Sequence, residues 1–96
     1  MTHKSHQTIE RELEIAKTQV KIGGTYSHYK NPEHLVKVVA IGTQEATDKL
    51  CVIYQEVSNG NLVFVRDLDV WLDKPLKDTP RFKLIVSGQD TSASRQ

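Results

Sequence analysis

The sequence predicts a mainly β protein of the α+β class. We expect about five strands in a small curled antiparallel sheet, or a partly open SH3-like barrel, behind an N-terminal amphipathic helix. Three observations predict this fold: apolar residues first recur at helical spacing, the period then changes to that of strands, and short turn signals separate the strand-like runs. We divide the chain into a disordered tail at 1–7, the helix at 8–22, a small β domain at 23–86 and a second disordered tail at 87–96.

The first predicted element is the helix at 8–22. Its apolar stripe has spacings of four, three and four and comprises Ile9, Leu13, Ala16 and Val20. Thr8 suits the N-cap, and Gly23 with Gly24 suits the end because glycine tolerates the left-handed conformation. Alternatively the helix ends near Gln19, and residues 20–22 enter a first strand. The stripe either covers an open end of the barrel or forms a homodimer through residues 9–20.

Strand-like runs fill most of the remaining chain, and they lie at 25–29, 35–41, 50–57, 62–65 and 82–86. Asn59-Gly60 is the strongest hairpin signal, because this pair supplies the positive φ angles of a tight turn, so the flanking strands should be antiparallel neighbours. Apolar residues at 68, 71 and 72 suit one helical turn, and prolines 75 and 80 bracket a loop.

Alternation along residues 25–29 divides their side chains between two faces. Tyr26 and His28 share one face, and Tyr29 lies on the other. We expect Tyr26 to begin the core face and Tyr29 to help form a surface. Phe64 and Trp71 are the largest apolar side chains of a chain that has few, so we expect both in the core.

Composition excludes several classes of protein. Thirteen Lys and Arg against twelve Asp and Glu give a formal charge of +1, without the basic excess that favours binding of extended nucleic acid. Cys51 is the single cysteine, which excludes an intramolecular disulfide and favours a reducing cytoplasm. No apolar stretch approaches the roughly 20 residues that span a bilayer, and residues 1–7 lack the apolar core of a signal peptide, so we expect no membrane association.

Catalytic and metal signals are weak. Cys51 alternates with Ile53 within a strand, so we expect a buried and inert thiol. Two histidine pairs, at 3 and 6 and at 28 and 34, lack a third ligand at a recognisable spacing. No phosphate loop, dinucleotide fingerprint or nucleophile elbow is present. We therefore assign no catalytic residue, no metal and no cofactor.

Five side chains are candidates for a ligand site, and they are His28, Tyr29, Tyr54, Arg66 and Arg81. Arg66 ends its strand, where a guanidinium can clamp a carboxylate or phosphate; the alternative is an ion pair with Asp67 or Asp69. Tyr54 offers a stacking face or packs in the core. Arg81 either stacks on an aromatic ring or contacts the ligand.

His28 has two interpretations. It is either an ordinary strand histidine that is hydrogen-bonded to a turn, or a ligand-binding or general-base residue. The second role would draw on a carboxylate such as Glu45 or Asp67.

Four segments together resemble a family of small bacterial domains known as domain of unknown function 1653. They are Gly24-Thr25-Tyr26-Ser27-His28-Tyr29-Lys30, Tyr54-Gln55, Phe64-Val65-Arg66 and Pro80-Arg81-Phe82. The family has no established chemistry to carry over. Its usual His-Ser-Glu-Thr run is replaced here by residues 42–47, which are longer and contain no histidine, and Asp67 replaces its proline. If those residues belong to the family's site, this chain has lost or altered that activity.

These observations favour a non-catalytic module that binds a small anionic or planar ligand, such as a nucleotide or modified base. The near-zero net charge favours a compact ligand over a long nucleic acid. One alternative is a small hydrolase or transferase with His28 as general base. A second is a protein-interaction domain that dimerises through the N-terminal helix.

Overall fold

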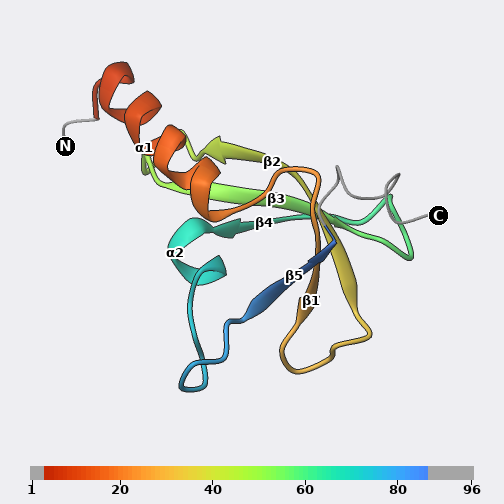
Figure 1. Cartoon of the computed structure of the whole chain (residues 1–96). Coiled ribbons are helices and arrows are strands. Elements are labelled where there is room, and N and C mark those ends of the chain that lie inside the picture. The colour runs from red at the N-terminus through yellow and green to blue at the C-terminus, as the bar shows by residue number, and fades with distance from the viewer. Residues whose placement is uncertain (1–3, 87–96) are drawn as a thin grey trace.

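The computed structural model describes residues 4–86 and confirms the predicted fold class. Five strands form one antiparallel sheet of order β4-β3-β2-β1-β5, with a helix at the N-terminus (Figure 1). The elements in chain order are α1 (His6–Gln19), β1 (Thr25–His28), β2 (Leu35–Thr43), β3 (Leu50–Glu56), β4 (Val63–Asp67), α2 (Leu68–Trp71) and β5 (Phe82–Val86). The predicted helical turn after β4 is therefore confirmed.

Helix α1 begins earlier than predicted. Ser5, rather than Thr8, is the N-cap, and its Oγ accepts a hydrogen bond from the Thr8 amide at 3.1 Å. Lys4 donates its backbone N–H to Asp48 Oδ2 at 2.8 Å. Residues 4–7, predicted as part of a disordered tail, therefore carry the cap and the first turn. Residues 1–3, and the tail predicted at 87–96, lie outside the described residues.

The end of α1 agrees with the alternative that placed it near Gln19, and not with the predicted end at residue 22. Val20 already has extended backbone angles, with φ −129° and ψ 124°. Residues 20–22 do not form a strand; they lead into a turn in which Gly23 has φ 89° and donates its N–H to Val38 O at 2.8 Å. The helix packs on β2 and buries Ala16 and Val20 of its apolar stripe.

The β3–β4 hairpin is confirmed, but its turn differs from the prediction. Gly60 does not have a positive φ, so the connection is a longer loop rather than a tight Asn-Gly turn. The Asn59 side chain explains the loop, because Oδ1 accepts from Asn61 N at 3.1 Å while the Asn59 carbonyl accepts from Leu62 N at 3.0 Å.

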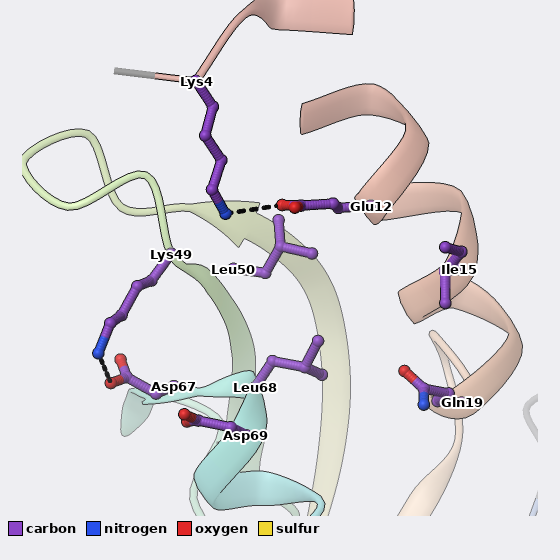
Figure 2. A pocket seen from close by; sticks show the side chains of 9 residues that line it. All are labelled: Lys4, Glu12, Ile15, Gln19, Lys49, Leu50, Asp67, Leu68 and Asp69. Atoms are coloured by element: carbon purple, nitrogen blue, oxygen red, sulfur yellow. Dashed lines mark hydrogen bonds and ion pairs between the residues drawn. The ribbon is translucent and has the colours of Figure 1, made fainter. Parts of the chain in front are cut away.

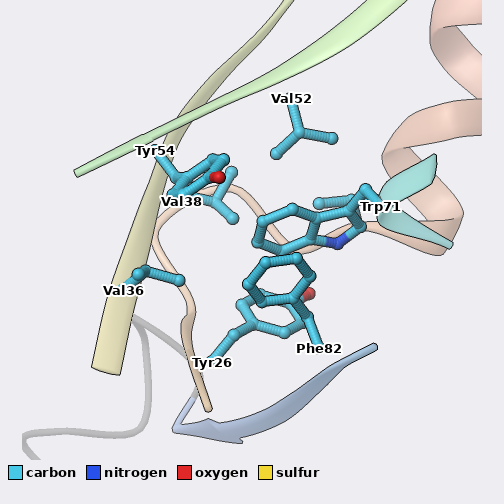
Figure 3. Close-up of a cluster of buried hydrophobic side chains, with 8 residues drawn as sticks. Tyr26, Val36, Val38, Val52, Tyr54, Trp71 and Phe82 are labelled. Carbon is cyan, nitrogen blue, oxygen red and sulfur yellow. The ribbon is translucent and has the colours of Figure 1, made fainter. Parts of the chain in front are cut away.

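The sheet curls until its two edges approach each other, and it does not close by hydrogen bonds. Register irregularities in β2, between Val38 and Ala40, and in β1, between Thr25 and Tyr26, bend the strands. Side chains then meet across the open seam. The ring of Phe82, on the β5 edge, stacks on Trp71 at 3.9 Å between centroids and 6° between planes (Figure 3).

Trp71 and Phe82 belong to a core cluster whose other members are Val20, Tyr26, Val36, Val38, Val52 and Tyr54. Tyr26 is 5% exposed and meets the Trp71 ring edge-on at 5.2 Å, which confirms its predicted place on the core face. Its hydroxyl accepts a hydrogen bond from Lys21 N at 2.9 Å, and burial raises its pKa above 10.0. Phe64, predicted to be in the core, is 41% exposed because its strand is an edge of the sheet.

The contrast between the two large rings gives a first prediction. Trp71→Ala should lower the free energy of unfolding by about 3–5 kcal/mol, because it leaves a cavity where the seam is closed. Phe64→Ala removes a more exposed ring and should lower it by less than about 1 kcal/mol. Urea unfolding followed by circular dichroism measures both values. Equal losses in the two variants would show that the seam does not depend on Trp71.

Candidate functional site

Three of the five predicted site residues line one groove. His28 at the end of β1, Tyr54 in β3 and Arg66 in β4 border a concavity of about 240 Å³, which we call the Arg66 groove. Its other lining residues are His34, Val36, Glu56, Phe64 and Phe82. The curl of the sheet creates this groove, because Phe82 of the β5 edge reaches side chains of β3 and β4.

Arg66 is held in place by contacts with uncharged side chains. Its Nε donates to the Tyr54 hydroxyl at 3.3 Å, and its guanidinium carbon lies 5.4 Å from the centroid of the Phe82 ring. Within residues 4–86, no carboxylate lies within ion-pair distance of this guanidinium, so the structure does not support the alternative of an ion pair with Asp67 or Asp69. Asp67 instead pairs with a lysine, Lys49, at 4.0 Å. The Nη groups of Arg66 therefore remain available to a ligand.

Tyr54 positions this arginine. Its ring is 7% exposed and packs against Trp71 at 5.1 Å and Phe82 at 5.8 Å, which agrees with the core interpretation of the sequence. Its hydroxyl nonetheless reaches the groove and meets Arg66. The residue thus joins the core to the groove.

His28 lines the same groove as Arg66, and its imidazole ring is neutral. The Lys30 amide donates to its Nδ1 at 3.1 Å, so the neutral ring carries its proton on Nε2. Burial lowers the pKa of His28 below 6.5, and the positive charges of Arg66 and Arg81 lower it further. The side chain therefore offers one N–H donor at neutral pH, among cationic neighbours.

The carboxylates suggested as partners of His28 lie elsewhere. Ser27 pairs with Leu35, which places His28 beside the start of β2, whereas Glu45 follows the end of that strand. Nine residues of strand separate the two ends by about 25 Å. The other suggested partner, Asp67, contacts Cys51 and Lys49 at the far end of β4.

Tyr29 and Arg81, the other two predicted site residues, lie outside the Arg66 groove. The Arg81 guanidinium stacks 5.9 Å from the Tyr29 centroid and bonds Asp73 at 3.2 Å, in agreement with the stacking interpretation. Tyr29 lines a neighbouring concavity of about 410 Å³, and His28 separates the two. The other residues of this concavity are Ser27, Pro32, Thr79, Pro80, Lys83 and Ile85.

Sequence reasoning missed two groove residues, His34 and Glu56. Their side chains approach at 3.5 Å between Nε2 and Oε2. The pairing of Val36 with Glu56 in the β2–β3 register brings them together, and this pairing could have been found by aligning the two strands from their turn. Glu56 places a hydrogen-bond acceptor in a groove that otherwise offers donors.

A second groove, also not predicted, lies between α1 and α2 (Figure 2). It measures about 320 Å³ and has an apolar lining of Ile15, Leu50 and Leu68, with charged residues at its rim. Those rim residues are Lys4, Glu12, Lys49, Asp67 and Asp69, and Gln19 completes the lining.

Cys51 lies beside this second groove, and its thiol is in an environment that disfavours reaction. Its side chain is 3% exposed, as the sequence predicted, and Sγ contacts Asp67 Oδ1 at 3.7 Å. Burial raises the pKa of the thiol above 9.0, and the Asp67 charge raises it further, so the reactive thiolate is disfavoured.

Among the described residues, His, Cys, Asp and Glu form no group of three that could hold a metal ion. No helix of residues 4–86 is long and apolar enough to cross a membrane.

The fold and the groove define a small mainly β domain with an aromatic and cationic depression on the concave face of its sheet. The family profile described as a protein of unknown function, DUF1653, matches residues 24–84, and the chain belongs to this family. Helix α1 precedes the matched residues. No curated protein and no solved structure matches the chain, so the likeness to SH3 barrels stays a prediction.

The segments that resemble the family are the ones that line the Arg66 groove. The four resembling segments supply most of its lining, namely His28, Tyr54, Phe64, Arg66 and Phe82. The two departures from the family pattern, at residues 42–47 and at Asp67, lie at the other end of the sheet. The replacement of the family's histidine and glutamate therefore leaves the Arg66 groove untouched.

The electrostatics of the groove predict the titration of His28. In the wild-type protein its pKa should lie below 6.5; Arg66→Gln should raise it, while Arg66→Lys, which keeps the charge, should raise it less. Burial, the largest cause, persists in both variants. Histidine ring resonances followed by NMR across pH measure this pKa. If the pKa of His28 were the same in the wild-type protein and in Arg66→Gln, this arrangement would be contradicted.

The same lowered pKa makes stability depend on pH. His28 contributes stability that is complete above the unfolded pKa of 6.5 and is lost as pH falls through its lower folded pKa. We expect His28→Gln to flatten the decline in unfolding free energy below pH 6.5, because the variant no longer takes up this proton on unfolding. Urea unfolding of both proteins at a series of pH values provides the comparison, and parallel declines would refute the assignment.

Proposed function

We propose that this domain is a non-catalytic module that binds a compact, planar, anionic ligand of the nucleotide or modified-base class in the Arg66 groove. One observation carries this proposal: a half-buried arginine without an acidic partner in the described structure is held in place by Tyr54 and Phe82 at the wall of an aromatic groove. A guanidinium fixed in this way suits recognition of phosphate or carboxylate, because its planar donors are already oriented.

The lining also suits a base. Phe64 is 41% exposed, and the tilted rings of Tyr54 and Phe64 lie 5.7 Å apart, so an aromatic face is available for stacking. Glu56 can accept a hydrogen bond from an amino or imino group of the base, while His28 Nε2 donates to a carbonyl or phosphate oxygen. The volume of about 240 Å³ is below the usual range for drug-sized ligands, which favours a single nucleotide or base.

The alternative functions have less support. A hydrolase or transferase that uses His28 as general base has less support, because the hydrogen-bonded partner of its Nδ1 is the Lys30 amide and the charges that act on the ring are positive. Glu56, in the same groove, pairs with His34. Dimerisation through residues 9–20 draws on a stripe whose Ala16 and Val20 are buried within the same chain. The reducing cytoplasm remains the expected compartment, because Cys51 is a free, buried thiol.

Titration of nucleoside monophosphates, nucleosides, free bases and inorganic phosphate, followed by amide chemical shifts, tests the proposal. We expect the monophosphates to shift His28, Phe64 and Arg66 most strongly. Arg66→Gln should weaken their binding about 10- to 100-fold, since a hydrogen bond to a charged group is lost. Lys83→Gln is the matched control, because it removes the same charge outside the groove.

Three results distinguish specific binding from its alternatives. Equal weakening by Arg66→Gln and Lys83→Gln would indicate nonspecific attraction of anions. Shifts confined to the α1–α2 groove would move the site to the other end of the sheet. If no compound of the panel shifted the amide resonances of the Arg66 groove, the proposal would be refuted.

A further inference from the structure

The outer edge of β4 carries backbone groups that the sheet leaves unpaired. The Glu56 amide donates to Leu62 O at 3.1 Å, and the register pairs Gln55 with Val63. Because hydrogen-bonded and non-hydrogen-bonded pairs alternate in an antiparallel ladder, the N–H and C=O groups of residues 62, 64 and 66 point toward β3. The N–H and C=O groups of residues 63 and 65 and the N–H of Asp67 point away from the sheet, and no other described strand pairs with this edge. The Asp67 carbonyl is already used, because Asp67 is the N-cap of α2.

The first half of this edge carries no charged side chain. Val63 is 53% exposed and Val65 is 63% exposed, and the charged residues of β4, Arg66 and Asp67, lie at its end. Natural proteins commonly guard such edges with charged residues, especially lysine, or with proline. The opposite edge, β5, carries Lys83 within its strand. The two edges thus differ in where their charges lie, and the stretch 63–65 of β4 is uncharged and open to strand addition.

We propose that β4 pairs with β4 of a second copy of this chain, antiparallel and centred on Val65, to form a two-fold symmetric dimer. In this register Val65 exchanges both backbone hydrogen bonds with its own counterpart, and the Asp67 N–H donates to the carbonyl of Val63 of the partner subunit. These are the residues whose backbone groups point outward. The pairing therefore uses the free edge and leaves the β3 ladder intact.

The side chains of β4 are complementary to themselves about this axis. Phe64 lies opposite Arg66 of the partner subunit in a close, non-hydrogen-bonded pair, which places a guanidinium next to an aromatic ring. Asp67 lies opposite Val63, so no like charges face each other directly. This self-complementarity favours a second copy over an unrelated strand. The partner's Phe64 would also extend the aromatic wall of the Arg66 groove.

Sedimentation equilibrium of the full chain, without nucleotide and over micromolar to millimolar concentrations, tests the dimer independently of any ligand. A five-residue strand pair buries less than a standard interface, so we expect weak association at the upper end of this range. Val65→Lys should weaken dimerisation at least about tenfold by placing two like charges at the axis. Ile15→Lys is the matched control, because Ile15 is an exposed apolar residue on α1.

Hydrogen exchange adds a readout that a folding defect would not imitate. On raising the protein concentration, the amides of Val65 and Asp67 should become protected, while those of Phe64 and Arg66 should keep the protection that β3 gives them. Association lost in Val65→Lys and retained in Ile15→Lys, with this alternating protection, supports the proposal. A monomer at every concentration, open-ended oligomers, or a dimer disrupted only by Ile15→Lys would overturn it.

Discussion

The stacking of Phe82 on Trp71 holds the two edges of the sheet together. The strand order leaves β4 and β5 at opposite edges, yet these rings lie 3.9 Å apart because α2 carries Trp71 back under the sheet directly after β4. The rest of the concave face depends on this contact. Arg66 lies over the same Phe82 ring, and His28 meets it edge-on at 5.2 Å. Without the stack, the residues that line the Arg66 groove would lie on a flatter sheet and would not face one another.

The groove combines an oriented positive charge with partial burial. Burial, and then the positive charges of Arg66 and Arg81, lower the pKa of His28, so the histidine acts as a donor of fixed orientation rather than as a third cation. The local acid, Glu56, is engaged by His34 and lies beside the region that Arg66 faces. The α1–α2 groove has the opposite character, because each of its lysines already contacts an acid. Only the first groove therefore retains an uncompensated, oriented cation within the described structure.

Much of this architecture could be predicted from the sequence. The change of period gave the order of helix and strands, and the apolar spacing after β4 gave the helical turn that carries Trp71. Features that depend on the strand order were not accessible. Phe64 looked like a core residue because nothing in its strand shows that β4 is an edge. The structure brings Tyr54 and Arg66 together with His28 in one groove, whereas Tyr29 and Arg81 lie outside it. The sequence pattern could not show this division, because it depends on how far the sheet curls. The Asn59 loop differs from a tight turn because the asparagine side chain competes for the backbone amides.

The seam between β4 and β5 is closed by aromatic rings and not by a backbone ladder, and this has an evolutionary consequence. A hydrogen-bonded seam would fix the spacing of the two edges for every sequence that adopts the fold, since strand separation in a ladder is nearly constant. Here that spacing follows from the sizes of the side chains at positions 71 and 82. Substitutions there can widen or narrow the neighbouring groove while the register of all five strands stays the same. Under the proposed function, related chains that differ at positions 71 and 82 would therefore accept ligands of different width without a change of topology.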